Sequence, residues 1–592
     1  MHHPGSHEIV LHDAHERRWL HFRRPRHVYQ TTNLAAVLPL LETVEARVEA
    51  EGLWAAGFLA YEAAPAFDRA LQTHPPSPGF PLLWFGLYPA PAAINLDAAP
   101  YPPSPPLSWQ PSVTPAAYEA AIATIKEQIA AGLTYQVNYS YRLRAPFTGD
   151  PWRYFLELVA AQEPGFGAYV DTGRFAICSA SPELFVQRDG ETVTSRPMKG
   201  TAPRGLTWED DCRQATWLHQ SEKNRAENVM IVDMIRNDFG RVARPGSVAV
   251  PALFTVERYP TVWQMTSTVT AATDVSHSRL LQAMFPCASI TGAPKRSTMN
   301  IIAELEPDPR YIYTGSIGYM APGRRLQLNV AIRTVLVDRE SGKGEYGVGG
   351  GIVWDSTPGE ELAETAHKAR VLTTRRPPFQ LLETVRWEPD TGYFLLEDHL
   401  RRLQRSADYF GFTFKLKAIT TALDRQATGF PATPQRVRLF LARSGEMTVE
   451  NYRYRPDPSP RRVCLAPQPI NRDDPFLYHK TTHRAVYENA LAACPGYDDV
   501  LFWNEDGELT ESSRANIILE LDGERVTPPV RSGLLPGIYR GWLLREGHVR
   551  EQVVRLSDLE RCTHLWLVNA LRGEQTAVLE HANSKSGDQP DV

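Results

Sequence analysis

The sequence predicts an α+β fold built from several consecutive domains. The chain has 592 residues, which is too long for one hydrophobic core because domains usually hold roughly 100–200 residues. Short apolar runs next to glycine turns alternate with segments of helical periodicity, a mixture typical of α+β proteins. Two arginines and two prolines at 375–378 separate two parts of the chain that differ in residue pattern. A helix before these prolines is expected to end there, since the residue before a proline disfavours helical backbone.

The elements of the first part follow from these patterns. Residues 175–179 and 184–188 are predicted strands, and an Asp-Gly turn leads from the second one into a strand at 192–195. The apolar stripe along 222–239 predicts a helix. Another helix is expected to begin at Thr357, which supplies a capping side chain followed by a proline and then by a glutamate three positions after the cap.

The second part predicts a similar mixture of elements. Strands are expected at 500–504 and 508–510 around an Asp-Gly turn, and a short helix is expected at 397–409. The predicted organisation comprises the N-terminal part of the first fold, a catalytic domain, a proline-rich linker, a second catalytic domain and a disordered tail, at 1–110, 111–375, 376–378, 379–580 and 581–592.

Composition argues against several classes of protein. The net charge of −5 provides no basic excess for neutralising phosphates, so nucleic acid is not an expected partner. The six cysteines form no Cys-x-x-Cys pair, which argues against a disulfide framework and favours a reducing compartment. The N-terminus lacks the apolar run of a signal peptide, and no stretch of about 18 apolar residues predicts a membrane span. We therefore expect a cytoplasmic protein.

Three features of the first part have both a chemical and a structural explanation. Glu227 lies on the apolar stripe of the predicted helix, where an unpaired carboxylate is costly, although spacing alone favours a solvated edge position. Glu364 and Lys368 are four residues apart, which spacing alone explains as a surface ion pair. The glycines at 349–351 predict either a tight turn or backbone N–H groups that face an anion.

Longer motifs connect these features in one order along the chain. They are Arg196-Pro197-Met198-Lys199-Gly200-Thr201, Ala226-Glu227-Asn228-Val229-Met230-Ile231-Val232-Asp233 with Arg236-Asn237-Asp238, Ser289-Ile290-Thr291-Gly292-Ala293-Pro294-Lys295, Tyr313 with Gly315 and Gly318-Tyr319, Ala331-Ile332-Arg333-Thr334, and the glycine run that leads to Glu364 and Lys368. The first part thereby resembles the chorismate-utilising enzymes. The resemblance implies a β-sandwich with helices, to which residues 1–110 contribute through the motif at 56–62.

The same resemblance implies amination at C4 of chorismate. Anthranilate synthases have alanine where this chain has Lys199, whereas aminodeoxychorismate synthases have lysine. A lysine amine can add at C2 as the C4 hydroxyl leaves, and ammonia then attacks C4 and expels the lysine. Because the ordinary lysine pKa of about 10.4 leaves the amine protonated at pH 7, burial or Mg²⁺ must lower the pKa of Lys199.

Further roles are implied for matching residues. Glu183 corresponds to the general acid/base that helps the hydroxyl to leave, and Glu227 and Glu364 correspond to the Mg²⁺ ligands. The residues implied to bind substrate are Ser289, Tyr313, Arg333, Gly349, Gly350, Gly351 and Lys368. Two positions depart from the family pattern, because Gln264 replaces a histidine and Asn224 replaces an acidic residue of some relatives.

The second part carries a different set of ordered motifs. They are Glu383-Thr384-Val385-Arg386, His399-Leu400-Arg401-Arg402-Leu403, His479-Lys480-Thr481-Thr482-His483-Arg484, Leu509-Thr510-Glu511-Ser512, Ala515-Asn516-Ile517, Gly533-Leu534-Leu535-Pro536-Gly537-Ile538-Tyr539-Arg540 and Asn569-Ala570-Leu571-Arg572-Gly573. This part resembles the fold-type-IV pyridoxal phosphate (PLP) enzymes, which include D-amino-acid and branched-chain aminotransferases and aminodeoxychorismate lyase. The resemblance implies a two-subdomain α+β unit.

This resemblance implies how the cofactor is held. Lys480 is the lysine that binds PLP covalently and, once released, shuttles protons. Glu511 pairs with the pyridinium nitrogen and keeps it protonated. The other implied PLP-binding residues are Arg402, Asn516, Gly537, Ile538, Asn569 and Ala570.

Together the two resemblances imply a bifunctional enzyme that makes 4-aminobenzoate for folate. No cysteine lies in a glycine-rich nucleophile elbow, so we expect a separate glutamine amidotransferase subunit to supply ammonia. The PLP domain implies a homodimer. Three alternatives stay open: the same synthase fused to an aminotransferase for D- or branched-chain amino acids, an anthranilate-type chorismate aminase, and a non-catalytic scaffold.

Overall fold

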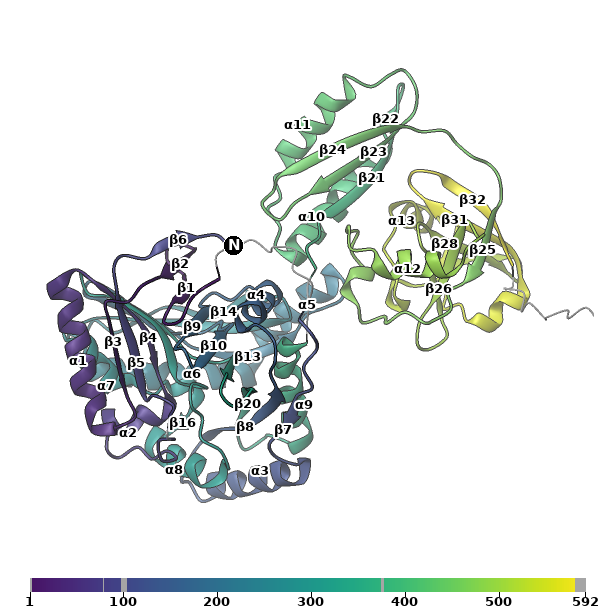
Figure 1. Ribbon diagram of the computed structural model, residues 1–592. Helices are drawn as coiled ribbons and strands as arrows, with labels where there is room; N and C mark the ends of the chain where they lie inside the picture. Colours follow the sequence, from purple (N-terminus) through teal and green to yellow (C-terminus); the bar gives the residue numbers. More distant parts are fainter. Residues whose placement is uncertain (1–2, 78, 97–103, 374–376, 581–592) are drawn as a thin grey trace, which may run out of the picture. The chain divides into compact units, whose positions relative to one another are not determined.

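The computed structural model describes residues 3–77, 79–96, 104–373 and 377–580. The chain forms two compact units, of which unit 1 comprises Met1–Pro203 and Gln214–Arg376, and unit 2 comprises Arg204–Arg213 and Pro377–Val592. The tail predicted at 581–592 lies outside the described residues, as does Arg376 of the predicted linker. Both units mix helices and strands, which confirms the predicted α+β class (Figure 1).

Unit 1 contains two ten-stranded sheets whose neighbouring strands are antiparallel. The first sheet has the order β16 (Gly292–Ala293), β8 (Gln136–Pro146), β20 (Lys343–Ile352), β19 (Thr334–Asp338), β10 (Phe175–Ser179), β9 (Ala168–Asp171), β1 (Ile9–Asp13), β2 (Arg18–Phe22) and β6 (Ala92–Ile94), with β7 (Gln110–Pro111) paired to β8. The second has the order β13 (Met198–Pro203), β15 (Val262–Ala272), β12 (Thr192–Arg196), β11 (Leu184–Asp189), β18 (Arg325–Asn329), β17 (Ser316–Ala321), β4 (Trp54–Leu59), β5 (Leu83–Tyr88) and β3 (His27–Thr31), with β14 (Ala249–Arg258) paired to β15.

The period-two pattern of the strands explains why the sheets stack. Ile9 and Leu11 of β1 belong to a core cluster with residues of both sheets, whereas Val10 between them belongs to a second cluster on the opposite face. Successive side chains of a strand point to opposite faces, so both faces of the first sheet are buried. This arrangement confirms the predicted β-sandwich, and residues 1–110 supply six complete strands of it, β1 to β6.

Helices cover the outer faces of the sandwich, and α1 lies along β3, β4 and β5 in Figure 1. They are α1 (Leu34–Glu51), α2 (Ala64–Phe67), α3 (Pro115–Ala130), α4 (Pro151–Gln162), α6 (Glu222–Gly240), α7 (His277–Met284), α8 (Lys295–Leu305) and α9 (Pro358–Ala369), while α5 (Trp208–Gln220) continues from the segment assigned to unit 2. The predicted helix at 222–239 is confirmed as α6. Helix α9 begins where predicted, but Thr357 Oγ1 donates a hydrogen bond to Glu360 Oε2 (2.7 Å) instead of capping a backbone N–H.

Unit 2 has the predicted two-subdomain construction. One subdomain is an antiparallel sheet, β22 (Gly392–Tyr393), β21 (Leu381–Glu388), β23 (Gln435–Leu441) and β24 (Met447–Arg453), packed on α10 (Leu396–Phe410) and α11 (Leu416–Ala427). The other is a mixed sheet in the order β27 (Leu509–Ser512), β26 (Asp499–Trp503), β25 (Arg461–Leu465), β32 (Gly573–Leu579), β31 (Cys562–Asn569), β28 (Asn516–Leu521), β29 (Glu524–Thr527) and β30 (Arg550–Glu551), accompanied by α12 (Ala485–Ala493) and α13 (Ile538–Arg545).

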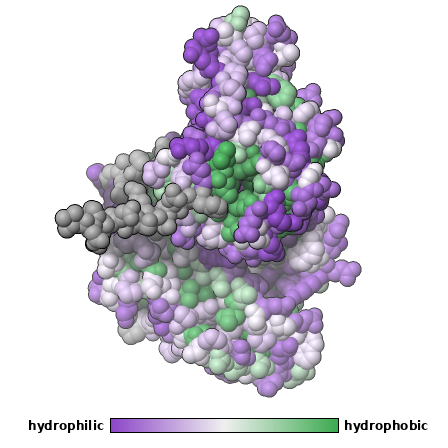
Figure 2. All heavy atoms as spheres, turned by 90° about the vertical axis from the view of Figure 1, so that its right-hand side faces the viewer, coloured by the Kyte–Doolittle hydropathy of each residue, from purple (hydrophilic) through white to green (hydrophobic). Residues whose placement is uncertain are grey.

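The hydropathy of the surface and of the helices is consistent with the ordinary composition of the chain. On the face drawn in Figure 2, hydrophilic residues surround a smaller area of hydrophobic ones. Among the described residues, no helix has both the length and the apolar character needed to cross a bilayer.

Candidate active sites

Lys199 lies on β13, at one end of the second sheet of unit 1. Its backbone carbonyl accepts a hydrogen bond from Asn228 Nδ2 of α6 (3.2 Å). The ammonium group approaches Gly351 of β20 so closely that a Cβ there would lie 2.8 Å from Lys199 Nζ. Burial lowers the pKa of Lys199, while Glu227 acts in the opposite direction. A lysine in such surroundings is more easily deprotonated and can act as a nucleophile.

Glu183 lies next to another predicted site residue. Its Oε1 accepts a hydrogen bond from Ser289 Oγ (2.6 Å), and Glu183 is only 3% exposed. Burial raises the pKa of Glu183 to about 7, although Ser289 and the charge of Lys199 both act to lower it. A carboxyl group with this pKa can give or take a proton near neutral pH. The structure therefore brings Lys199, Glu183 and Ser289 into one site.

The two departures from the family pattern both contact β13. Gln264 of β15 donates from Nε2 to the carbonyl of Gly200 (2.8 Å) and accepts from Thr201 Oγ1 (3.0 Å). Asn224 of α6 lies against Gly200, where an added Cβ would be 3.0 Å from the Asn224 Cβ. These two residues fix the strand that carries Lys199.

The predicted metal ligands Glu227 and Glu364 interact electrostatically across the site. Glu364 Oε1 pairs with Lys368 Nζ at 2.6 Å, and Lys368 chiefly causes the pKa of Glu364 to fall. Burial raises the pKa of Glu227. Among the described residues no cluster of three His, Cys, Asp or Glu side chains could hold a metal ion. Mg²⁺ needs only one or two protein carboxylates beside waters and substrate oxygens, so this pair fits the ion.

A third carboxylate near this pair was not identified from the sequence. Glu361 of α9 is 7% exposed, and Ser356 Oγ donates to its Oε1 (2.6 Å) while its buried Oε2 has no hydrogen-bond partner. Burial and the charge of Glu364 raise its pKa. Glu361 could have been selected from the sequence, because it lies three residues before Glu364 and residues three apart share a helix face.

Of the predicted anion contacts, the three glycines lie in β20 and Arg333 directly precedes β19. The tight-turn interpretation of the glycines is wrong, since Gly349–Gly351 are paired to β8 within β20. On the other side β19 pairs only with the start of β20, at Lys343–Tyr346. Lys368 Nζ donates to the carbonyl of Gly349 (2.9 Å). Arg333 has φ 51°, and a positive φ in a bulky residue stores strain of a kind found at functional sites.

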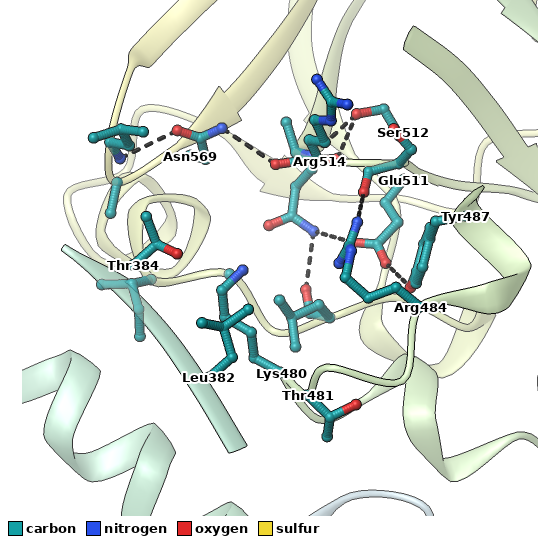
Figure 3. Close-up of a pocket in the computed structure, with 18 of the residues that line it drawn as sticks. Leu382, Thr384, Lys480, Thr481, Arg484, Tyr487, Glu511, Ser512, Arg514 and Asn569 are labelled. Atoms are coloured by element: carbon teal, nitrogen blue, oxygen red, sulfur yellow. Dashed lines mark hydrogen bonds between the residues drawn. The ribbon is translucent and has the colours of Figure 1, made fainter. Parts of the chain in front are cut away.

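Unit 2 contains a pocket of about 270 Å³ around Lys480. Figure 3 shows the Lys480 side chain beside Leu382, with Glu511 and Asn569 higher in the view. Burial and the charge of Arg402 lower the pKa of Lys480 to about 8. Lys480, Glu511, Arg402, Asn516, Gly537, Ile538, Asn569 and Ala570, all predicted from the sequence, line this one pocket.

Glu511 is oriented by two neighbours, one of which was missed. Tyr487 of α12 donates its hydroxyl to Glu511 Oε1 (2.7 Å), as a dashed line in Figure 3 marks. Asn516 Nδ2 donates to Glu511 Oε2 (3.1 Å). Burial raises the pKa of Glu511 to about 7. Tyr487 belongs to none of the ordered motifs of this part, so no pattern in the sequence selects it.

Arg402 and Gly537 of the pocket lining suit a phosphate group. Arg402 donates through Nε and Nη2 to both oxygens of Glu383 (2.9 and 2.7 Å), which fixes its guanidinium. Gly537 directly precedes α13, and a Cβ there would lie 1.8 Å from Asn516 Oδ1. These residues fit PLP. Arg402 is a fixed cation for the phosphate, Gly537 leaves room for the phosphate at the start of α13, and Lys480 and Glu511 line the same pocket.

Comparison with known proteins defines the class of the chain. It belongs to the family of chorismate binding enzymes, whose model matches residues 6–374. The model of class IV aminotransferases matches residues 380–577. The chain thus joins a chorismate-binding unit to a class IV aminotransferase unit.

Individual relatives are similar to the first unit. Aminodeoxychorismate synthase component 1 of Escherichia coli is 43% identical over 262 residues, which is 44% of this chain and 57% of that protein. Anthranilate synthase component 1 of Streptomyces coelicolor is 38% identical over 292 residues, 48% of this chain and 57% of that protein. The chain therefore spans little more than half the length of these relatives. The solved anthranilate synthase component I of Streptococcus pneumoniae is 25% identical, with a TM-score of 0.52, and covers 63% of this chain and 94% of its own.

Proposed function

We propose that the chain converts chorismate into 4-aminobenzoate, first by amination in unit 1 and then by elimination of pyruvate in unit 2. The observation that carries the proposal is Lys199, a buried amine with a lowered pKa beside Glu183. Relatives named for anthranilate and for aminodeoxychorismate synthesis both match, so overall similarity does not choose the carbon that is aminated. A nucleophilic lysine favours C4, as its chemistry requires.

In unit 1 the amine of Lys199 attacks C2 of chorismate, the ring double bond moves, and the C4 hydroxyl leaves as water with a proton from Glu183. Ammonia then attacks C4, the double bond returns, and the C2–Nζ bond breaks to release Lys199. Arg333 binds a substrate carboxylate. Glu227 and Glu364 would hold Mg²⁺, which supplies positive charge for the other carboxylate.

In unit 2, PLP supplies an electron sink for the second reaction. Arg402 and the backbone at Gly537 would hold its phosphate, and Glu511 would keep its ring nitrogen protonated. Lys480 removes the proton from C4 of the aminated ring, after which the C3–O bond breaks and the side chain leaves as the enolate of pyruvate, which becomes pyruvate when it gains the proton that Lys480 took up. The ring becomes aromatic, so the elimination is strongly favourable.

One incubation tests the proposal against its main alternative. Chorismate, Mg²⁺, ammonium and PLP are expected to yield 4-aminobenzoate and pyruvate in equal amounts. D-alanine or a branched-chain amino acid with 2-oxoglutarate is expected to give no amino transfer. Rapid transamination without 4-aminobenzoate would instead identify unit 2 as an aminotransferase, the activity for which its matching family is named.

Further parts of the proposal concern partners and location. The E. coli relative is named component 1, which supports a separate amidotransferase component as the source of ammonia for this chain. We place dimerisation in unit 2 and the protein in the cytoplasm. If glutamine alone supported full turnover of the purified chain, a separate ammonia source would be unnecessary.

Substitution Glu183→Gln is expected to slow amination about 10²–10⁴-fold, the usual contribution of a general acid. With its pKa raised to about 7, Glu183 is protonated below that pH and ionised above it. A proton donor is therefore lost as pH rises, and the wild-type rate should decline through about pH 7. The Gln variant should lack this decline.

The measurement is chorismate consumption between about pH 5.5 and 8.5 at constant free ammonia. Glu340→Gln is the control, since Glu340 is 65% exposed and pairs with Arg174 on the surface of unit 1. A decline near pH 7 that survives in the Glu183 variant would assign the proton to another group.

Substitution Glu364→Gln is expected to raise the Mg²⁺ concentration for half-maximal amination by about 10–100-fold, because one of two carboxylate ligands loses its charge. Glu360→Gln on the same helix is the control, because Glu360 is exposed and bonds only to Thr357 among the hydrogen bonds recorded for its side chain. Mg²⁺ titrations of both variants make the comparison. Equal half-saturation in the two variants would remove Glu364 from the metal site.

A further inference from the structure

The segment Arg204–Arg213 follows β13 in the chain, yet it belongs to unit 2. Its apolar side chains are part of that unit's interior. Leu206 packs against the cluster that contains Tyr478 and Tyr487, and Trp208 packs against the cluster that contains Phe410. Arg405 of α10 lies over the Trp208 ring at 5.1 Å. Ten residues from the chorismate-binding half of the sequence therefore complete the hydrophobic interior of the PLP unit.

Arg204 is the most constrained side chain of this segment. It donates through Nε and Nη2 to both carboxylate oxygens of Asp211 (2.6 and 2.7 Å), and the two side chains are 7% and 4% exposed. Arg204 also donates to the carbonyl of Tyr409 (2.8 Å), and its Cζ lies 4.3 Å from the centre of the Tyr409 ring. The Tyr409 hydroxyl donates in return to the carbonyl of Gly205 (2.8 Å). A paired, buried cation with this geometry fixes Tyr409 firmly.

Tyr409 in turn contacts His479, the residue that precedes Lys480. The rings of Tyr409 and His479 are 4.2 Å apart between centres, and Ser406 Oγ lies 3.0 Å from His479 Nδ1. His479 is 4% exposed, and it directly precedes Lys480. Arg204, Tyr409 and His479 thus form a stack that ends at the backbone of the reactive lysine.

The surroundings keep the imidazole of His479 neutral. Burial lowers its pKa to about 3, the charge of Arg204 acts in the same direction, and the carbonyl of Leu206 acts against it. The groups that face it are Arg204 and Leu206 of the segment and Ser406, Tyr409 and Phe410 of α10, with Lys480 next in the chain. Arg204 and Leu206 therefore contribute to the pKa of His479 from a distant part of the sequence.

We propose that Arg204 is a positioning residue for Lys480, acting through Tyr409 and His479, so that the PLP site depends on a segment of the chorismate-binding half. This rests on the proposed function of Lys480 as the PLP-binding lysine. The segment reaches His479 through Tyr409 and through the carbonyl of Leu206, and these contacts exclude water and hold the lysine backbone in place. A fragment that begins at Pro377 would lack segment Arg204–Arg213 and therefore these contacts.

The test compares Arg204→Ala with Arg213→Ala in the full chain loaded with PLP. Arg213 lies on the same segment, is 74% exposed and pairs only with Asp210 among its recorded ion pairs, so its loss should leave the site intact. In Arg204→Ala, water reaches His479 and its pKa rises towards the ordinary value of about 6.5. The imidazolium formed below that pH places a new positive charge beside Lys480.

The readout is the absorption spectrum of the bound cofactor, titrated between about pH 5 and 9. Arg204→Ala should show an additional ionisation near pH 6 that the wild type and Arg213→Ala lack. Turnover in unit 2 should fall about tenfold below pH 6 with KM changed less than about twofold, because binding groups stay in place while the lysine is displaced. Amination by unit 1 should be unchanged.

Two results would overturn the inference. One is an Arg204→Ala titration that matches the wild type. The other, if that variant does not fold, is a wild-type titration for Asp211→Asn, which keeps the side-chain shape but weakens the pairing with Arg204. Failure of the proposed function looks different, because the wild-type chain itself would then form no covalent PLP absorption band.

Discussion

Substitution Lys480→Ala should abolish release of 4-aminobenzoate and pyruvate while aminodeoxychorismate accumulates. The expected loss in unit 2 is about 10³–10⁶-fold, the range seen when a group that reacts directly is removed. Lys480 has a pKa lowered to about 8, so about one tenth of the amine is unprotonated at pH 7 and can take the C4 proton. None of the other residues that line the pocket is a lysine, which leaves arginines and histidines as poor substitutes.

The pH dependence of this step follows from the same pKa. An amine with a pKa of about 8 is a base above that pH and is protonated below it. The rate of elimination by the wild type should therefore rise with pH through about 8, and the rise should be absent from the residual activity of Lys480→Ala. Lys417→Ala is the control, since Lys417 is an exposed residue of α11 in the same unit.

Product analysis separates this prediction from a general loss of folding. Chromatography of the reaction should show chorismate consumed at the wild-type rate and the aminated intermediate retained. Addition of the wild-type chain should then convert the intermediate into 4-aminobenzoate. If Lys480→Ala released 4-aminobenzoate at the normal rate, unit 2 would not be the lyase.

Local patterns in the sequence predicted the elements that depend on local interactions. Helix α6 and strands β10, β11 and β12 occur where periodicity and turn residues placed them, because an apolar stripe or an Asp-Gly turn is decisive within a few residues. The ordered motifs also identified residues that converge, such as Lys199 and Gly351, which are far apart in the sequence.

The residues that were missed depend on packing between distant segments. Glu361 becomes notable only because its Oε2 is buried without a partner near Glu364. Tyr487 becomes notable only through its bond to Glu511. Segment Arg204–Arg213 has no periodicity that would assign it to unit 2, and the Arg204 contacts with Tyr409 cross about two hundred residues of sequence. Contacts between residues that are far apart in the chain depend on the three-dimensional fold, and no local pattern in the sequence predicts them.

Substitution Lys199→Ala should stop amination at C4, with a loss of about 10³–10⁶-fold. Without the amine at C2, no group is available to displace the double bond as the C4 hydroxyl leaves, and direct displacement by ammonia has no covalent route. Glu183 and Ser289 remain bonded to each other in this variant, so the hydroxyl can still be activated.

The space left by Lys199 gives this prediction a second, qualitative part. Its amine lies against Gly351, where an added Cβ would be 2.8 Å away, and removal of three methylenes and the amine opens room for ammonia near C2. Attack at C2 with loss of the C4 hydroxyl is the chemistry implied for relatives with alanine at this position. Slow formation of a C2-aminated product is therefore expected, and Lys480 cannot convert that isomer into 4-aminobenzoate.

Mass spectrometry and chromatography of the products distinguish the two isomers. Lys343→Ala is the control, because Lys343 is exposed at the start of β20, the strand that also carries Gly351. Trapping also discriminates: without ammonia, wild-type protein incubated with chorismate should gain the mass of chorismate minus water, whereas Lys199→Ala should gain none. Normal 4-aminobenzoate formation by Lys199→Ala would exclude the covalent route, and the burial that lowers the pKa of Lys199 would then serve only to pack β13 against α6.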